Sequence, residues 1–392
     1  RQAFNILIKM NTKLDFPAHL KDLKPFLAME VLEESQRLQA QGKDVISFSI
    51  GEPDFPTPKP ILEALIQAIQ EGETHYTHCQ GLLELREAIA EHYLERYQVT
   101  VHPDQIFVTS GSSPALLLAL SVVLSPGDEV LLPEPYYPCY PNFLKYLQAS
   151  ISYQSSSAKQ DFYLNVDHLK ESIQSQSKAL LLGSPANPTG QILSSQDLKK
   201  LAHLPLRLIV DEVYHGLSEK PEHSILEFTD QAFVINGFSK AYAMTGFRLG
   251  YLIAPFHFIE LLRKLSQNLF ISTTTFVQKA GIAALQKTQK EQEFMRQELK
   301  IRRELLLKGL KELNFPILGE PQGAFYLLAQ SSKFHPNSLE FCSQLLQQAK
   351  VALTPGLDFS RQGEGLVRFS YTTSQEGIQE GLKRIAQFLA QA

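Results

Sequence analysis

The feature of this sequence that most constrains its fold is a series of short apolar runs that alternate with amphipathic stretches. Most of these runs are nearly continuous, which is typical of strands buried on both faces of a sheet. The stretches between them, such as 114–124, 139–149 and 194–203, have the periodicity of helices. This alternation predicts an α/β domain with a mostly parallel, doubly wound sheet over about residues 50–285. The apolar runs are DVISFSI (44–50), QIFVTS (105–110), DEVLLPE (128–134), KALLLGSP (178–185), LRLIVDEV (206–213), AFVINGF (232–238) and GYLIAP (250–255).

A different pattern begins after residue 285. Residues 287–313 carry many charges of both signs around an apolar stripe, so we expect one long amphipathic helix that leads into a second domain. The later signals are short strands at 323–329 and 366–371 and a closing helix near 374–391. Together they predict a smaller α+β domain.

We expect three segments in this chain of 392 residues, which is long enough for one large and one smaller domain. Residues 1–50, with a helical pattern around 26–41, would join the small domain. Residues 51–285 would form the large domain and residues 286–392 the small one. Met10 is a candidate native start, with the residues before it as an extension.

The charge pattern argues against nucleic acid and membranes as partners. The chain has 37 Lys and Arg against 41 Asp and Glu, a net charge of −4, and the two signs are interspersed. There is no polybasic run, and the longest apolar runs, such as ALLLALSVVL (115–124), are too short to span a bilayer. Cys79, Cys139 and Cys342 are widely spaced, which fits a reducing compartment better than a disulfide scaffold. We therefore expect a cytoplasmic protein.

The residues that follow the predicted strands are informative, because ligands bind at the carboxyl ends of strands in open α/β sheets. The run IFVT is followed by SGSS, where Gly111 would let backbone amides approach a ligand. Ser113 is a good N-cap and Pro114 suits the first helical position. Such a helix N-terminus binds anions, most often phosphate. A capped helix without a ligand is the alternative interpretation.

Four further strand ends carry groups of different chemistry. PYYPCY supplies adjacent aromatic rings, and NPTG supplies Asn187 before Pro188, where a cis bond would aim the amide. Asp211 follows four apolar residues, and a buried carboxylate there needs a cation. VINGFSK ends on Lys240. An anion site, an aromatic surface, an amide, a carboxylate and a lysine match pyridoxal 5'-phosphate, which has a phosphate, a flat ring, a protonatable ring nitrogen and an aldehyde.

Several motifs also carry a resemblance to a known family: SKAYAMTGFRLGY (239–251), NPTG (187–190) and DEVY (211–214). From SIGEPDF (49–55) to VRFSY (367–371), the chain resembles the fold-type I pyridoxal-phosphate-dependent aminotransferases of class I/II. The resemblance implies a large domain with a seven-stranded, mostly parallel sheet and a smaller α+β domain. It also implies a ping-pong aminotransferase that moves the amino group of an L-amino acid to a 2-oxo acid such as 2-oxoglutarate.

The resemblance implies three catalytic residues and a neighbour that supports them. Lys240 is similar to the family's Schiff-base lysine, which binds the cofactor and later carries a proton between substrate and cofactor. Asp211 would keep the pyridine nitrogen protonated, which makes the ring an electron sink. Tyr214 and Asn187 would hydrogen-bond the ring's 3'-oxygen.

The other residues implied by the resemblance bind cofactor or substrate. Arg248 would hold the phosphate with its planar fork. Tyr76 would reach the phosphate in the neighbouring subunit, which implies a homodimer with shared active sites. Gly237 stands where many members have a serine, so one hydroxyl contact to the phosphate would be missing. The remaining cofactor-binding residues would be Gly111, Ser112, Ser113, Ser239 and Tyr137, which would stack on the ring, and the substrate α-carboxylate site would comprise Gly51, Asn187 and Arg368.

Other functions stay open at this point. A C–S β-lyase of the same fold would share most of these residues, and a non-catalytic regulator on this fold is a further alternative. Residues 266–276 contain no Lys or Arg, and Ser113 stands where bacterial aspartate-preferring relatives often have lysine, so a neutral donor such as alanine or an aromatic amino acid is favoured. His75, His78 and Cys79 lack a second ligand pair at suitable spacing, so no metal site is expected.

Overall fold

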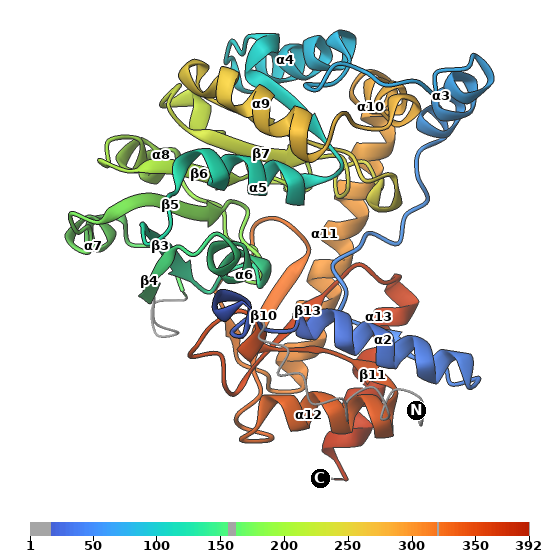
Figure 1. The fold of residues 1–392 in the computed structure, drawn as a ribbon. Coiled ribbons are helices and arrows are strands. Elements are labelled where there is room, and N and C mark those ends of the chain that lie inside the picture. The colour runs from blue at the N-terminus through green and yellow to red at the C-terminus, as the bar shows by residue number, and fades with distance from the viewer. Residues whose placement is uncertain (1–16, 156–161, 320, 392) are drawn as a thin grey trace, which may run out of the picture.

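The computed structural model describes residues 17–155, 162–319 and 321–391, so the candidate start Met10 lies outside the described residues. Figure 1 shows an upper part built around a large sheet and a lower part around a small one, with helix α11 (Gln289–Glu312) running from one into the other. The other helices are α2 (Leu27–Ala40), α3 (Lys59–Gln70), α4 (Leu83–Tyr97), α5 (Ser112–Val123), α6 (Cys139–Tyr146), α7 (Val166–Glu171), α8 (Ser195–Ala202), α9 (Ile259–Leu269), α10 (Thr275–Lys287), α12 (Ser338–Gln344) and α13 (Gln375–Leu389).

Seven strands form the large sheet, in the order β2-β8-β7-β6-β5-β3-β4. All neighbouring pairs are parallel except those of β8, which is antiparallel to β2 and to β7. The predicted seven-stranded, mostly parallel sheet is therefore confirmed. The strands are β2 (Ile106–Thr109), β3 (Glu129–Glu134), β4 (Ser150–Ser155), β5 (Ser177–Gly183), β6 (Arg207–Asp211), β7 (Phe233–Gly237) and β8 (Gly250–Ile253).

Apolar side chains cover both faces of the large sheet. Along β5, Leu180 and Leu182 pack into a core that includes residues of α4 and α8, whereas Ala179 and Leu181 pack into a second core with residues of α5, α6 and α9. Successive strand residues point to opposite faces, so a strand that serves both cores must be apolar at every position. This is the physical reason for the continuous apolar runs in the sequence.

One strand of the large sheet was not among the predicted apolar runs. The run 44–50 forms β1 (Ile46–Ser47), which lies outside the large sheet and pairs with β11 (Val351–Ala352). The seventh strand of the large sheet is β4, whose sequence SISYQS is mostly polar. Because β4 is an edge strand with partly buried and exposed side chains, it does not need two apolar faces and has no continuous apolar run.

A second, antiparallel sheet organises the lower part of the molecule. Its strand order is β12-β13-β10-β9, which agrees with the predicted strands at 323–329 and 366–371. The division of the chain at residues 50 and 285 stays a prediction. Within the described ranges, no helix has the length and apolar content needed to cross a membrane. The strands are β9 (Ile317–Leu318), β10 (Tyr326–Gln330), β12 (Thr354–Pro355) and β13 (Leu366–Ser370).

Candidate active site

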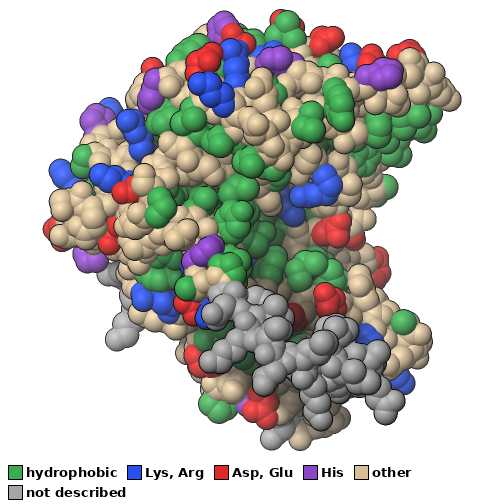
Figure 2. Space-filling view, in the orientation of Figure 1, with side chains coloured by type: hydrophobic (Ala, Val, Ile, Leu, Met, Phe, Trp, Pro, Cys, Tyr) green, Lys and Arg blue, Asp and Glu red, His purple; other side chains and the backbone are tan. Residues whose placement is uncertain are grey.

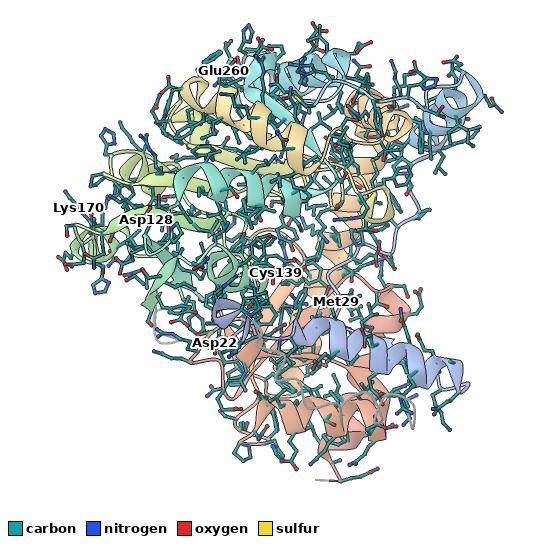
Figure 3. All side chains as sticks on the ribbon, viewed as in Figure 1. Asp22, Met29, Asp128, Cys139, Lys170 and Glu260 are labelled. Atoms are coloured by element: carbon teal, nitrogen blue, oxygen red, sulfur yellow. The ribbon has the colours of Figure 1, made fainter. Side chains whose placement is uncertain are left out.

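A cavity of about 390 Å³ opens at the carboxyl ends of β3, β5, β6 and β7, where the large sheet meets β10, β13 and the first turn of α2. In Figure 3, Met29 on α2 and Cys139 at the start of α6 are labelled near this junction. The cavity brings together eleven of the residues predicted from the sequence. They are Gly51, Ser112, Ser113, Tyr137, Asn187, Asp211, Tyr214, Ser239, Lys240, Arg248 and Arg368.

Lys240 lies three residues after the end of β7 and points its amine into the cavity. Its Nζ atom donates a hydrogen bond to the carbonyl oxygen of Gly51 at 2.6 Å. Burial lowers the pKa of Lys240 to about 8, because water no longer solvates the charged form. A larger fraction of neutral, nucleophilic amine is therefore present near neutral pH than on a surface lysine.

Asp211 is the last residue of β6 and is almost completely buried. Its carboxylate accepts hydrogen bonds from the Tyr140 hydroxyl at 2.8 Å and from the Val213 backbone N–H at 3.1 Å. Burial raises the pKa of Asp211 to about 6 even so. A cationic ring nitrogen beside this carboxylate would offset the cost of burying its charge.

The N-terminus of α5 forms a backbone cradle that faces an arginine. The helix begins at Ser112, and its N-cap is Gly111 with φ +92°, so the prediction of Ser113 as N-cap and Pro114 as first helical residue was wrong by two positions. The physical reason is the positive φ at Gly111, which turns the chain into the helix earlier. A Cβ atom at Gly111 would lie 2.4 Å from an Nη atom of Arg248, so the missing side chain lets the guanidinium approach the backbone closely. Backbone N–H groups and a guanidinium thus converge on one point, as in an anion site.

Arg368, in the middle of β13, is 2% exposed and lies between two aromatic rings. Its guanidinium carbon is 4.3 Å from the ring centre of Tyr326 and 4.7 Å from that of Phe359. One Nη donates to Asn187 Oδ1 at 2.9 Å, the other donates to the Ser49 carbonyl, and Nε has no partner. Among the described residues no carboxylate lies within ion-pair distance of this arginine, although the charge of Arg368 acts to lower the pKa of Asp358. A buried cation without a directly paired carboxylate favours binding of an anion.

Three hydrogen-bonding side chains meet beside the lysine. The Tyr214 and Tyr326 hydroxyls are 2.8 Å apart, and Asn187 Nδ2 donates to Tyr214 at 3.4 Å. The Asn187–Pro188 bond is cis. Burial raises the pKa of Tyr214 well above its usual value, so this hydroxyl keeps its proton and can donate it in a hydrogen bond.

Two predicted residues lie away from the cavity. Tyr76 is 83% exposed and belongs to a shallow surface depression, so its own chain does not bring it to the site. Gly237 lies in β7 opposite Gly250, and a Cβ atom there would be 3.1 Å from the Leu249 carbonyl oxygen. The predicted consequence of Gly237 for phosphate binding stays a prediction.

The sequence reasoning missed two tyrosines that contact the predicted residues. Tyr140 bonds Asp211 and lies only three positions after Tyr137 in PYYPCY, so the aromatic cluster contained a usable signal. Tyr326 lies in the strand GAFYLLA, where an aromatic residue has the ordinary interpretation of core packing. Its contacts depend on how the small sheet packs against the large one.

Comparison with known families identifies the family of the chain that forms this cavity. The family described as aminotransferase class I and II matches residues 43–385, nearly the whole chain. The chain belongs to this family. It is therefore an aminotransferase that uses pyridoxal 5'-phosphate and acts on small amino acid and 2-oxo acid substrates.

Individual relatives agree with this assignment. The (5-formylfuran-3-yl)methyl phosphate transaminase of Methanocaldococcus jannaschii is 41% identical over 94% of this chain and 98% of its own length. A probable aspartate aminotransferase of the same organism is 36% identical over 92% of this chain and 96% of its own length. The structure of aspartate aminotransferase from Thermus thermophilus with maleate has a TM-score of 0.91 at 33% identity, covering 95% of this chain and 99% of the other.

The groups in the cavity fit the cofactor that the family uses. A backbone cradle with an arginine suits a phosphate, and a buried carboxylate with a raised pKa suits a protonated ring nitrogen. The lysine amine, whose pKa is lowered, suits an aldehyde. The Nε atom of Arg368 has no hydrogen-bond partner, so the guanidinium suits the substrate carboxylate.

Proposed function

We propose that this aminotransferase works by a ping-pong mechanism in which Lys240 binds the cofactor and carries the transferred proton. The donor would be a neutral L-amino acid and the acceptor a 2-oxo acid such as 2-oxoglutarate. The observation that supports this most is the convergence of Lys240, Asp211 and Arg368 on one cavity. These three groups match the aldehyde and ring nitrogen of the cofactor and the α-carboxylate of the substrate.

Each side chain would have a separate task at the cofactor. Pyridoxal 5'-phosphate, when bound, withdraws electrons from the substrate Cα and holds the amino group between the two half-reactions. Asp211 would hold the proton on the ring nitrogen, and Asn187 and Tyr214 would donate hydrogen bonds to the ring oxygen. The phosphate ligands would be Ser112, Ser113, Ser239 and Arg248, which line the cavity, and Gly111, the N-cap of α5 beside Arg248, and Tyr137 would stack on the ring.

Arg368 and Lys240 would act on the substrate itself. The planar guanidinium of Arg368, fixed between two rings, would bind the α-carboxylate in two places beside Gly51. This orientation would bring the Cα–H bond towards Lys240. With a pKa of about 8, the Lys240 amine can both take and return a proton near neutral pH.

The preference for a neutral donor rests on the charges of the cavity. Its described cations are Lys240, Arg248 and Arg368, and each has a proposed task that leaves none for a second substrate carboxylate. The α2 side of the cavity is lined by the apolar residues Phe26 and Met29, which suit an apolar side chain. Relatives named as aspartate aminotransferases make aspartate the most informative competitor.

We also propose that the chain acts as a homodimer in the cytoplasm. Tyr76 is highly exposed and outside its own cavity, which supports a role in the active site of a second subunit. The exposed apolar residues Leu62, Ile66 and Ile69 on α3 would be covered by such a partner. Figure 2 shows hydrophobic side chains gathered at the upper right edge of this face, where α3 lies.

Single-turnover absorbance measurements test the proposal. The holoenzyme is mixed with alanine, phenylalanine, aspartate or glutamate, and loss of its visible band is followed before 2-oxoglutarate is added to restore it. Neutral donors are expected to react faster than aspartate, and Lys240→Ala is expected to react with none. A large aspartate preference would overturn the donor assignment, and wild-type rates in Lys240→Ala would overturn the role of the lysine.

The lyase alternative needs its own measurement. A C–S β-lyase would release pyruvate and ammonia from cystathionine without any 2-oxo acid acceptor. We expect no such release at a rate comparable with transamination.

A further inference from the structure

Tyr326 is a buried tyrosine, 2% exposed, that reaches the active site from the small sheet. It is the first residue of β10, and its register partner on β13 is Ser370, two residues after Arg368. Its ring packs against the guanidinium of Arg368, and its hydroxyl contacts Tyr214. It therefore touches the proposed substrate clamp and the proposed ligand of the cofactor oxygen at the same time.

The hydrogen bonds of Asn187 fix the direction of this network. Arginine can only donate, so the Asn187 oxygen that faces Arg368 at 2.9 Å must be the acceptor. The amide nitrogen then faces Tyr214, 3.4 Å away, and donates to the tyrosine oxygen. Tyr214 thus receives one hydrogen bond whose direction is set by a charged partner.

The Tyr214 hydroxyl has a single proton and two neighbours in this network. If that proton went to Tyr326, Tyr214 could offer none to an anionic ring oxygen in the cavity. If Tyr326 donates instead, Tyr214 receives two hydrogen bonds and its own proton is free. Hydrogen bonds received by a hydroxyl oxygen also make that hydroxyl a stronger donor.

We propose that Tyr326 is a positioning residue of this active site, whose hydroxyl donates to Tyr214 and thereby directs the Tyr214 proton to the cofactor's ring oxygen. Its ring at the same time fixes the orientation of the Arg368 guanidinium plane for the substrate carboxylate. This assignment rests on the proposed cofactor site. Tyr326 would then be a second residue of the small sheet, besides Arg368, with a role in this active site.

The Tyr326 hydroxyl lies in the space left by the missing side chain of Gly51. A Cβ atom at Gly51 would lie 1.8 Å from the Tyr326 hydroxyl oxygen and 2.8 Å from the ring carbon that bears it. The absence of a side chain at Gly51 therefore leaves the space that this hydroxyl fills. The Gly51 carbonyl also accepts the hydrogen bond of Lys240, so the tyrosine hydroxyl and the lysine amine both lie against this residue.

The test is Tyr326→Phe in the holoenzyme, with Tyr371→Phe as matched control. Tyr371 is equally buried and donates its hydroxyl to the Ala324 carbonyl at 3.2 Å, but it does not line the cavity. Two quantities are measured: the pH midpoint of the visible absorption change of the bound cofactor, and kcat and KM with the best donor. Loss of a donor to Tyr214 weakens stabilisation of the anionic ring oxygen. Tyr326→Phe should therefore raise the pH midpoint and lower kcat by about tenfold, with KM changed less than about threefold.

A second variant, at Gly51, displaces the Tyr326 hydroxyl without changing the tyrosine. Gly51→Ala places a methyl group where the Tyr326 hydroxyl lies, so it should also raise the pH midpoint, and it provides the answer if Tyr326→Phe does not fold. An unchanged midpoint in a folded Tyr326→Phe or Gly51→Ala holoenzyme overturns the proposal. An equal shift in Tyr371→Phe also overturns it, because the effect would then come from general packing of the small sheet. A wild-type enzyme without a visible band or transamination would instead overturn the proposed function.

Discussion

The guanidinium of Arg368 lies between the rings of Tyr326 and Phe359, where its planar shape matters as much as its charge. We expect Arg368→Lys to raise KM for every amino acid donor by about 100-fold, because an ammonium group cannot bind a carboxylate in two places. Cofactor binding, measured by the visible band, should change little. Steady-state kinetics with several donors checks this.

A second stacked arginine provides the control for that substitution. Arg361 lies 4.0 Å over the Tyr153 ring and pairs with Glu134, but it does not line the cavity. Arg361→Lys should leave KM nearly unchanged. A KM for Arg368→Lys within a few-fold of wild type would contradict the role of this residue as the carboxylate clamp.

Lys240 makes cofactor attachment depend on pH. Only the neutral amine attacks an aldehyde, and burial lowers the pKa of this lysine from 10.5 to about 8. The rate at which apoenzyme binds pyridoxal 5'-phosphate covalently should therefore rise up to about pH 8 and level off above it. Rapid mixing with absorbance detection between about pH 6.5 and 9.5 measures the midpoint. A rate that keeps rising through the whole range would mean that the lysine amine keeps its ordinary basicity.

At the scale of elements, helix α2 depends on a carboxylate far away in the sequence. Its own N-cap residue, Phe26, offers no side-chain cap, and Asp358 instead accepts hydrogen bonds from Leu27 N at 3.1 Å and Ala28 N at 3.2 Å. Asp358→Ala should lower the free energy of unfolding by about 1–2 kcal/mol, since it leaves the first turn of the helix uncapped. Asp358→Asn keeps an acceptor and should lose less. Urea unfolding compares the two variants, and equal losses would argue against a capping role.

The same carboxyl group gives a pH dependence with a defined sign. Burial raises the pKa of Asp358 from 3.8 to about 6, so the folded state disfavours the charged form. The contribution of Asp358 to the free energy of unfolding of the wild type therefore decreases as pH rises from about 4 to above 6. An asparagine at this position does not titrate, so its contribution does not change over this range. The stability of Asp358→Asn relative to wild type should rise by about 1 kcal/mol between pH 5 and pH 7.5. A relative stability that falls over this range would contradict the raised pKa.

At the scale of the whole molecule, the proposed dimer can be tested by mixing inactive subunits. If Tyr76 acts in the neighbouring active site, a hybrid of Lys240→Ala and Tyr76→Ala subunits contains one site with both residues intact. Activity should therefore reappear after the two variants are unfolded and refolded together. The quantity measured is activity per hybrid dimer, with an expected value near half of wild type.

The control hybrid pairs Lys240→Ala with Arg248→Ala. Arg248 lines the cavity of its own chain, so neither site of this hybrid is complete. It should stay inactive. Recovery of activity in the control hybrid, or none in the Tyr76 hybrid, would contradict shared active sites.

Much of the fold could be predicted because its signals are local. Strands that face two cores must be apolar at every position, so β5 and β6 are visible in the sequence, whereas β4 at the sheet edge is polar and was missed. The N-cap of α5 was predicted two positions too late, because the helix begins after the positive φ of Gly111 and not after the hydroxyl of Ser113. The sequence pattern carries residue types but not backbone angles.

The same distinction between local signals and long-range contacts applies to the active site. The sequence by itself determined which chemical groups follow the strands, because Asn187, Asp211 and Lys240 come directly from short motifs at strand ends. Only the tertiary structure decided that Tyr326 reaches Tyr214, or that Asp358 caps α2 across 330 residues of chain. Such contacts depend on how two sheets and a helix pack together, and no local spacing or periodicity encodes that arrangement.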